Sequence, residues 1–327
     1  MKFILSISIS AAFLLLFFQV IDFSETLTLI KSLNKIHLLT SIFFLVVSSL
    51  LRTHRWYVIM KLLSEKVTFS QCLSPMIGSL ALNGILPFRG GDLARVFIFS
   101  KNMNVQNSNI MASMVVERVF DLFLILILLS ISMFYIDFIS IPIWLSRSIL
   151  SLSLIIVVLA LLIITFRQVA ISFFKQIKKI NFLSKSMIAT RSSDFLIETL
   201  LGLGTFIKLR NVFSMLNLSL YIWLTQAAVF YFLIIGLTEI NDPMASVFSS
   251  SVIAISTVIP SSPGYFGSFH YAALLSFDLV FQDKNLGGAY ALLSHAIFWL
   301  PITLIGLVML IVDKKYLNIL DKAYNSD

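Results

Sequence analysis

Charged side chains are rare in this chain, and those that could do chemistry gather in a few short stretches. Only 12% of the 327 residues are charged, yet the stretch NGILPFRGGDLAR, which begins at Asn83, holds Arg89, Asp92 and Arg95 within two helical turns. A guanidinium binds a phosphate or a carboxylate through two parallel hydrogen bonds. The stretch therefore predicts a site for a phosphate-bearing head group, built from these four side chains. The alternative is a loop just outside a membrane, where the arginines meet lipid phosphates non-specifically.

The same stretch interrupts an apolar run, and the interruption predicts a cavity. Pro87 is expected to stop the preceding helix, while Gly90 and Gly91 permit positive φ angles and a close approach of the backbone to a ligand. Free N–H groups at the start of the following helix would add affinity for an anion. In hydrocarbon a broken helix persists only where protein or a wet cavity surrounds it. Both glycines are therefore expected to lie at the head group.

Three ionisable residues occupy the first third of a later apolar stretch. Glu117, Arg118 and Asp121 lie three or four residues apart, so they share one surface of a helix. Such residues are costly inside a membrane unless they are paired or hydrated, and we expect them to face the interior of a bundle. Arg118 is expected to bind the head group, and Glu117 and Asp121 to form an ion network with Arg89 or Arg95, or to couple transport to protons. The alternative is a purely structural ion network.

A second helix break is predicted in the stretch VIPSSPGYFGSFH. Pro260, Pro263, Gly264 and Gly267 interrupt the helix there and are expected to line the same cavity. His270 follows in the returning helix, where it could take up a proton or donate to a phosphate. A lone histidine inside a membrane is also often a hydrogen-bonded core residue. No spacing typical of a metal site occurs, so neither a metal nor a cofactor is expected.

The elements that must position these residues are membrane helices. The chain is 58% hydrophobic, contains 30 phenylalanines and has a mean hydropathy of +0.97, whereas a soluble domain is about one quarter charged. Runs of this length and composition predict an all-α, polytopic membrane helical bundle. Full spans are expected at 3–21, 37–51, 110–136, 148–166, 212–237 and 287–312.

Basic residues predict the orientation of these spans. Segments 52–66 and 167–210 and the tail after residue 312 are rich in lysine and arginine, whereas 137–147 and 239–243 are not. The positive-inside rule places the basic segments and both termini in the cytoplasm, at the inner (plasma) membrane of the cell. The same bias accounts for the net charge of +8, so no nucleic-acid partner is expected.

Two segments, 69–108 and 245–281, are interrupted by the proline–glycine breaks and must return to the side from which they enter. They predict two re-entrant broken hairpins besides about six full spans; if the second segment is instead two short spans, the chain crosses eight times. The order of span, hairpin and span recurs with reversed orientation, as in an inverted repeat.

The repeat divides a single integral membrane domain, residues 1–327. The first half covers about 1–166 and the second 211–327, and a basic cytoplasmic linker, 167–210, joins them. No motif of a hydrolase, a nucleotide-binding loop or a dinucleotide fold is present, so the chain is not expected to be an enzyme.

Together these motifs carry a family resemblance. The run from Asn83 to Arg95, the Glu117-Arg118-x-x-Asp121 pattern and the run from Pro260 to Gly267 resemble the transmembrane domain of lysylphosphatidylglycerol synthases, over about residues 3–312. That domain also occurs alone in flippase-like membrane proteins. The resemblance implies the movement of lipids between leaflets. The chain ends about fifteen residues after its last span and so looks like the stand-alone form, without the soluble aminoacyl-transferase domain.

The resemblance also implies a substrate class. Stand-alone relatives are linked to cell-envelope pathways, which implies a phospholipid or a polyprenyl-linked lipid as substrate and envelope-synthesis proteins as partners. The chain departs from the family pattern at Tyr265, where a glycine is expected, and at His270, where an acid is expected. A lipid translocase or scramblase without a chemical step is the leading hypothesis. A membrane transferase acting on a lipid-linked substrate, with Asp92, Glu117 or Asp121 as base, and a non-catalytic member of an envelope-synthesis complex are the alternatives.

Overall fold

The structure, a computed structural model, is helical wherever it is described. It describes residues 2–99, 103, 105–136, 165–177, 187–206, 208–258 and 262–313, with single residues between 147 and 162. The described part contains α-helices and short 3-10 turns and no strand. Most of the span expected at 148–166, and the proline Pro260, lie outside the described residues.

The helices fall into three groups. The long ones are α1 (Lys2–Val20), α3 (Lys35–Leu63), α6 (Asn107–Tyr135), α11 (Leu209–Thr238) and α14 (Lys284–Val312), with the shorter α2 (Phe23–Ser32) after α1. Two hairpins consist of α4 (Phe69–Asn83), η1 (Pro87–Arg89) and α5 (Gly90–Phe97), and of α12 (Pro243–Ser256), η4 (Pro263–Tyr265) and α13 (Ser268–Phe281). At the periphery lie α8 (Arg167–Ile177), α10 (Met187–Leu203) and η3 (Gly204–Phe206).

Among the described helices, α3, α11 and α14 are each long and apolar enough to cross a membrane. A helix of 29 residues is about 43 Å long, which exceeds the roughly 30 Å of a hydrocarbon core. Large apolar side chains such as Phe43, Phe134 and Phe213 point outward from the bundle, where lipid would cover them. The protein is therefore a multi-pass helical membrane protein, as its composition predicts.

Polar side chains mark where several helices begin. The carboxylates of Asp242 and Asp283 accept hydrogen bonds from backbone N–H groups in the first turns of α12 and α14, and Thr68 forms a reciprocal capping box with Gln71 at the start of α4. These caps satisfy N–H groups that have no partner within the helix. Each hairpin therefore begins at a residue that the sequence specifies locally.

Both hairpins expected from the helix breaks are present. Helix α4 packs along α5, α12 packs along α13, and the turns η1 and η4 at the two tips contact each other. The longest of these helices, α4, has 15 residues and extends about 22 Å, which is less than the thickness of a hydrocarbon core. The two breaks therefore meet inside the bundle.

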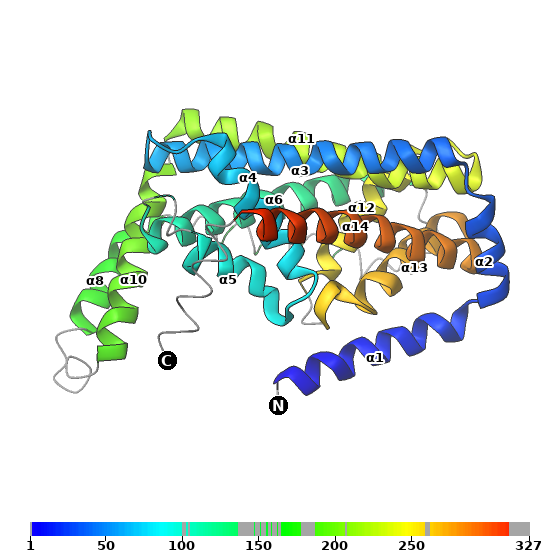
Figure 1. Cartoon of the computed structure of the whole chain (residues 1–327), viewed down its shortest axis with the longest axis horizontal. Helices are drawn as coiled ribbons and strands as arrows, with labels where there is room; N and C mark the ends of the chain where they lie inside the picture. Colours follow the sequence, from blue (N-terminus) through cyan, green and yellow to red (C-terminus); the bar gives the residue numbers. More distant parts are fainter. Residues whose placement is uncertain are drawn as a thin grey trace.

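The two halves of the chain pack as an inverted repeat. Helix α3 lies antiparallel to α11, because Asn34 at the start of α3 donates to Gly236 near the end of α11, while Arg55 near the end of α3 donates to Ser219 near the start of α11. Figure 1 shows the two helices side by side along one edge of the molecule. The main contacts of the core helices recur in the two halves: α4 packs on α14 as α12 packs on α6, and α3 packs on α4 as α11 packs on α12. This arrangement places the hairpin tips at the centre of the molecule.

One expected boundary is wrong. The span expected to end at residue 51 continues without interruption as α3 to Leu63, which carries Arg52 and Arg55 within the helix. The count of basic residues could not reveal this, since the carboxylate that balances Arg55 lies far away in the sequence, at Asp121. The bend of 83° between α1 and α2 was also not expected.

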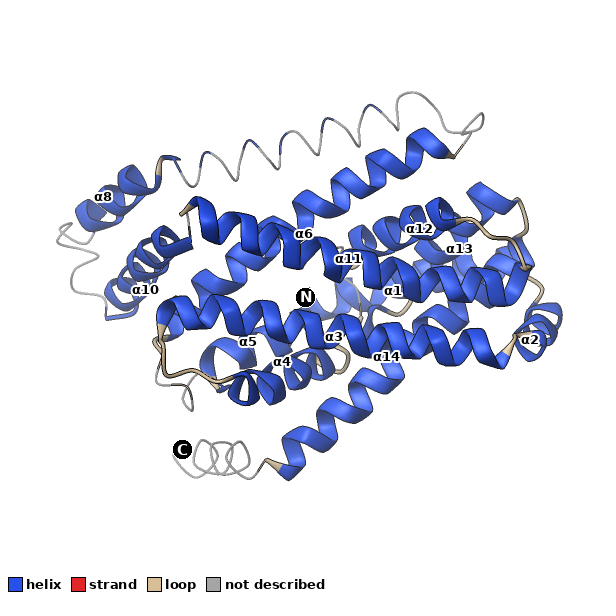
Figure 2. Ribbon diagram, turned by 90° about the horizontal axis from the view of Figure 1, so that it is seen from above, coloured by secondary structure: helices blue, strands red, loops and turns tan. Residues whose placement is uncertain are grey.

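The linker between the halves contains two described helices. In both views α8 and α10 lie at one end of the molecule and α2 lies at the other (Figure 1, Figure 2). Helix α10 packs on α6, where Ser108 donates to the carboxylate of Glu198 at 2.9 Å. A Cβ atom at Gly202 would lie 2.9 Å from Asn109, so this glycine permits the close packing of α10 on α6.

Candidate functional site

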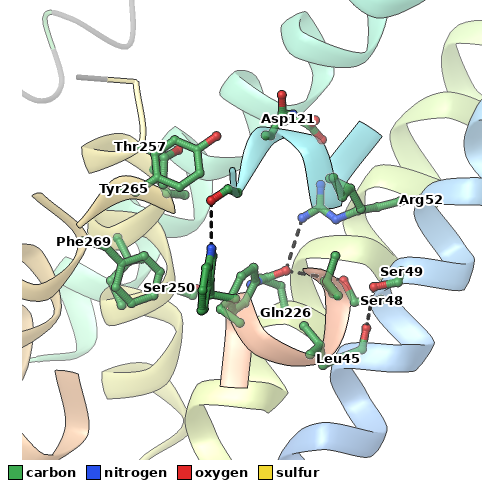
Figure 3. Close-up of a pocket in the computed structure, with 18 of the residues that line it drawn as sticks. Leu45, Ser48, Ser49, Arg52, Asp121, Gln226, Ser250, Thr257, Tyr265 and Phe269 are labelled. Carbon is green, nitrogen blue, oxygen red and sulfur yellow. Dashed lines mark hydrogen bonds between the residues drawn. The ribbon is translucent and has the colours of Figure 1, made fainter. Parts of the chain in front are cut away.

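A cavity of about 390 Å³ lies between the two halves of the repeat. Its walls come from α3, α4 and α6 of the first half, from α11, α12, α13 and α14 of the second, and from both hairpin tips. Figure 3 shows Arg52 and Gln226 on one side of the cavity and Thr257 and Tyr265 on the other. Apolar side chains such as Leu45 and Phe269 complete the wall. The cavity is therefore an apolar chamber with a few fixed polar groups, as is typical of ligand sites.

At the two hairpin tips, the equivalent carbonyl oxygens at the ends of α4 and α12 each accept a hydrogen bond from a side chain. Arg89 Nη2 donates to the carbonyl oxygen of Thr257 at 3.1 Å, where α12 ends, and Trp299 Nε1 donates to the carbonyl oxygen of Gly84 at 2.9 Å, where α4 ends. Gly264 has a φ of 73°, and a Cβ atom there would lie 3.1 Å from the Gly84 oxygen. Its missing side chain thus permits the close approach of the two tips, as expected for a glycine that lines the break.

At the first break the positive φ angle falls on Arg89, not on the glycines. Arg89 has a φ of 55°, whereas Gly90 and Gly91 belong to the regular helix α5. The role of Gly91 is close packing, because a Cβ atom there would lie 1.9 Å from the carbonyl oxygen of Ser79 in α4. Pro87 does not stop α4, which ends at Asn83; it begins the turn η1 instead.

Asp92 sits between the tip and α6. Its carboxylate accepts from Asn83 Nδ2 at 3.0 Å and from Arg118 Nη2 at 3.0 Å, and its backbone N–H donates to Asn83 Oδ1 at 3.1 Å. One of the N–H groups at the start of α5 is therefore already taken. Asn83 and Arg118 line the cavity, whereas Asp92, Gly90 and Gly91 lie behind its wall.

A buried ion network joins α3, α5 and α6. Asp121 accepts both terminal nitrogens of Arg55, at 2.6 and 3.0 Å, and also Trp223 Nε1 at 3.1 Å. Glu117 accepts Arg95 Nη2 at 2.8 Å, and the Arg95 guanidinium lies 5.0 Å from the centre of the Trp56 ring. The expected pairing of Glu117 with Arg95 is present, whereas Asp121 pairs with Arg55 rather than with an arginine of the first break. Of these groups only Asp121 and Trp223 line the cavity.

Two arginines of the cavity wall have no carboxylate partner among the described residues. Arg52 Nη2 donates to Gln226 Oε1 at 3.2 Å and its guanidinium lies 5.4 Å from the centre of the Trp223 ring. Among the described residues, Arg89 donates to the carbonyl and hydroxyl oxygens of Thr257 and interacts with the hydroxyl of Tyr265, all of them neutral groups. The ion pairs of the region are Arg55–Asp121, Arg95–Glu117 and Arg118–Asp92, with a long contact of 3.9 Å between Arg55 and Glu117. Arg52 and Arg89 therefore leave the cavity with unbalanced positive charge.

The histidines of the second break lie at the rear of the cavity. His270 does not line it; its ring stacks among Phe17, Phe266 and His295, with 4.4 Å between the centres of the two imidazole rings. His295 does line the cavity and shares a hydrogen bond of 2.8 Å with the carbonyl oxygen of Gly264. His270 thus contacts the cavity lining through His295 and Phe269 without lining the cavity itself.

The remaining residues of the second break hold the hairpin in place. Pro263 begins the turn η4, and Gly267 has a φ of 89°. A Cβ atom at Gly267 would lie 2.4 Å from the carbonyl oxygen of Ser10 in α1, so this glycine brings α13 against the first helix. Among the described residues no group of three or more histidine, cysteine, aspartate or glutamate side chains is arranged to hold a metal ion.

Sequence reasoning did not find Arg52, Gln226 or Trp299. Arg52 was assigned to a cytoplasmic connection, and Gln226 and Trp299 lie in long apolar helices without a local motif. A signal for Arg52 and Gln226 was nevertheless present, because polar residues within a span usually face the interior of a bundle.

Comparison with known proteins yields one family and two relatives. The model of the family described as lysylphosphatidylglycerol synthase TM region matches residues 3–306. A UPF0104 membrane protein of Methanocaldococcus jannaschii is 30% identical over 248 residues, which cover 75% of this chain and 98% of the relative. A UPF0104 membrane protein of Pyrococcus horikoshii is 25% identical over 341 residues, covering 97% of this chain and 99% of the relative. No solved structure matches the chain.

Proposed function

The chain belongs to the lysylphosphatidylglycerol synthase transmembrane-region family, and we propose that it moves an anionic lipid between the two leaflets of a membrane. The family is the one that the three sequence motifs resemble. The proposed substrate is a phosphate-bearing phospholipid or a polyprenyl-linked envelope lipid. Its head group occupies the central cavity while its tails remain in the bilayer. The membrane proposed is the plasma membrane, with both termini in the cytoplasm.

The unbalanced arginines of the cavity support this proposal most strongly. Arg52 and Arg89 hold only neutral acceptors, Gln226 and Thr257. Both side chains are half-buried at the cavity wall, and a partly desolvated charge without a counter-ion is costly, so an unpaired arginine within a membrane protein indicates a functional site. An anionic head group would supply the missing charge and accept charge-assisted hydrogen bonds from both guanidiniums.

The inverted repeat suggests how the head group crosses. The tips of the two hairpins meet beside the cavity and are closed by Arg89 and Trp299. In transporters built from inverted repeats, one half rocks or opens against the other around a fixed central site. We propose that a head group competes with the Thr257 carbonyl for Arg89, so that binding loosens the contact between the tips.

We propose no chemical step. A membrane transferase would need a carboxylate that is free to accept a proton, but Asp92, Glu117 and Asp121 each accept a hydrogen bond from an arginine. Paired in this way, the three carboxylates stabilise the contacts of α6 with α3 and α5. The ion network is therefore assigned a positioning role, and the unpaired arginines the binding role.

The proposal is tested with the full-length protein in proteoliposomes that contain a fluorescent phosphatidic acid or phosphatidylglycerol. A membrane-impermeant quencher reports how much of the labelled lipid has reached the outer leaflet. We expect the protein to accelerate flipping. Arg89→Gln and Arg52→Gln should each slow flipping at least tenfold, because each removes one charge-assisted hydrogen bond that contributes about 1.5–3 kcal/mol.

Lys284→Gln serves as the matched control, because it removes the same charge from an exposed residue at the start of α14. It is expected to flip lipid at the wild-type rate. No acceleration by the wild-type protein, or equal rates for the control and both arginine variants, would refute the proposed function.

A further inference from the structure

The charge of the cavity specifies more than the sign of the ligand. We infer that the head group carries two negative charges, as a terminal phosphomonoester or a diphosphate does, rather than the single charge of a phosphodiester. This inference rests on the proposed function and names the substrate class of the same cavity.

The excess positive charge is two whether the cavity wall or the whole network is considered. The described wall contains the three arginines Arg52, Arg89 and Arg118 and one acid, Asp121. Beyond the wall, the network adds as many acids as arginines. The added residues are Arg55, Arg95, Asp92 and Glu117. Because the pairs cancel, the two guanidiniums that remain are those of Arg52 and Arg89.

The two guanidiniums approach the cavity from different elements. Arg52 lies on α3 with Gln226 beside it, across the cavity from Thr257 (Figure 3). Arg89 lies at the hairpin tip and donates to the carbonyl oxygen of Thr257. Both are bound to their neutral acceptors through Nη2, and a guanidinium has five N–H donors in all. A ligand between them can therefore accept hydrogen bonds from both without breaking an ion pair.

The electrostatics of a mostly apolar cavity then favour a dianion. A zwitterionic head group has no net charge and leaves both guanidiniums unbalanced. A phosphodiester balances one guanidinium, and a phosphomonoester or a diphosphate balances both. Charges in a site of low effective dielectric constant interact several times more strongly than in water, so each unbalanced charge weakens binding substantially. The cavity is therefore expected to rank these lipids in that order.

The substitution Gln226→Glu tests the inference with little change in shape. Gln226 Oε1 already accepts from Arg52 Nη2, and a carboxylate at this position would pair with Arg52 and reduce the excess charge from two to one. At roughly 8 Å and an effective dielectric constant of about 20, one added charge changes the affinity for each charge of the ligand about 30-fold. The preference for a dianion over a monoanion should fall by that factor.

Binding is measured by native mass spectrometry of the purified protein at pH 8, where a phosphomonoester is almost fully ionised. The probes are phosphatidic acid, phosphatidylglycerol and phosphatidylcholine with the same acyl chains. We expect the wild-type protein to prefer phosphatidic acid over phosphatidylglycerol by tenfold or more, and Gln226→Glu to lower that preference about 30-fold, so that a tenfold preference is lost or reversed. Gln226→Met, which removes the acceptor without adding charge, should keep it.

A matched control makes the same chemical change elsewhere. Gln168→Glu adds a carboxylate at an exposed position of α8 and should leave the preference unchanged. Equal affinity of the wild-type protein for phosphatidic acid and phosphatidylglycerol would overturn the inference, as would an unchanged preference in Gln226→Glu. If both lipids are flipped at equal rates, only the inference fails; if neither is flipped, the proposed function fails.

Discussion

Neutralising Asp121 tests whether the buried network holds the helices together. Its carboxylate accepts Arg55 Nη1 at 2.6 Å, Arg55 Nη2 at 3.0 Å and Trp223 Nε1 at 3.1 Å, and both charged side chains are buried. In Asp121→Asn, Arg55 keeps Ser219 at 2.6 Å, and its remaining carboxylate is Glu117 at 3.9 Å. Breaking a buried pair by removing one partner costs about 3–5 kcal/mol.

The expected loss is measured as thermal unfolding in detergent micelles, followed by tryptophan fluorescence. A cost of 3–5 kcal/mol corresponds to a decrease in Tm of about 6–15 °C. Glu239→Gln, the same kind of neutralisation at an exposed residue, is the control and should shift Tm by no more than 1 °C.

A double-mutant cycle separates the pair from its surroundings. Arg55→Met removes the cation that Asp121→Asn leaves unpaired, so the double variant should be more stable than the sum of the two single losses predicts, by about 2 kcal/mol or more. Additive losses, or a Tm of Asp121→Asn equal to that of the control, would refute the reasoning that this ion pair stabilises the contact between α3 and α6.

Two further substitutions test the packing and closure of the hairpins. Gly91→Ala places a Cβ atom 1.9 Å from the Ser79 oxygen and should lower the free energy of unfolding by about 1–3 kcal/mol. Gly287→Ala, where the nearest atom is 3.4 Å from the new Cβ atom, should be neutral or stabilising. Thermal unfolding measures both variants, and equal effects would contradict the close approach of α5 to α4. Trp299→Phe removes the bond to the Gly84 oxygen and should accelerate amide hydrogen exchange at the end of α4, while unchanged exchange would show that this bond does not close the tip.

The helical class and the two hairpins could be predicted because their signals are local. Mean hydropathy indicates lipid-facing helices. The proline–glycine breaks at Pro87 and Pro263 divide apolar stretches into segments too short for two full spans, so the chain is expected to turn back at each break. The burial of Glu117 and Asp121 followed from their cost in hydrocarbon, and both side chains are buried. These inferences need only composition and spacing.

The parts that could not be predicted depend on contacts between distant residues. A basic residue near the end of a span indicates a connection unless a buried acid balances it, and the acid that holds Arg55 is 66 residues away. The positive φ of Arg89 is likewise not indicated by its residue type, and its side chain donates to Thr257, 168 residues further along the chain. Arg52 was also not predicted as a cavity residue, because its acceptor Gln226 lies 174 residues further along the chain.

An experimental structure of the protein in lipid nanodiscs containing phosphatidic acid tests the central claim most directly. We expect a lipid phosphate inside the central cavity, with oxygens about 2.7–2.9 Å from guanidinium nitrogens of both Arg52 and Arg89, the distance of a charge-assisted hydrogen bond. Lipid head groups found only at the outer surface of the bundle, with the cavity between the hairpin tips free of phosphate, would contradict it.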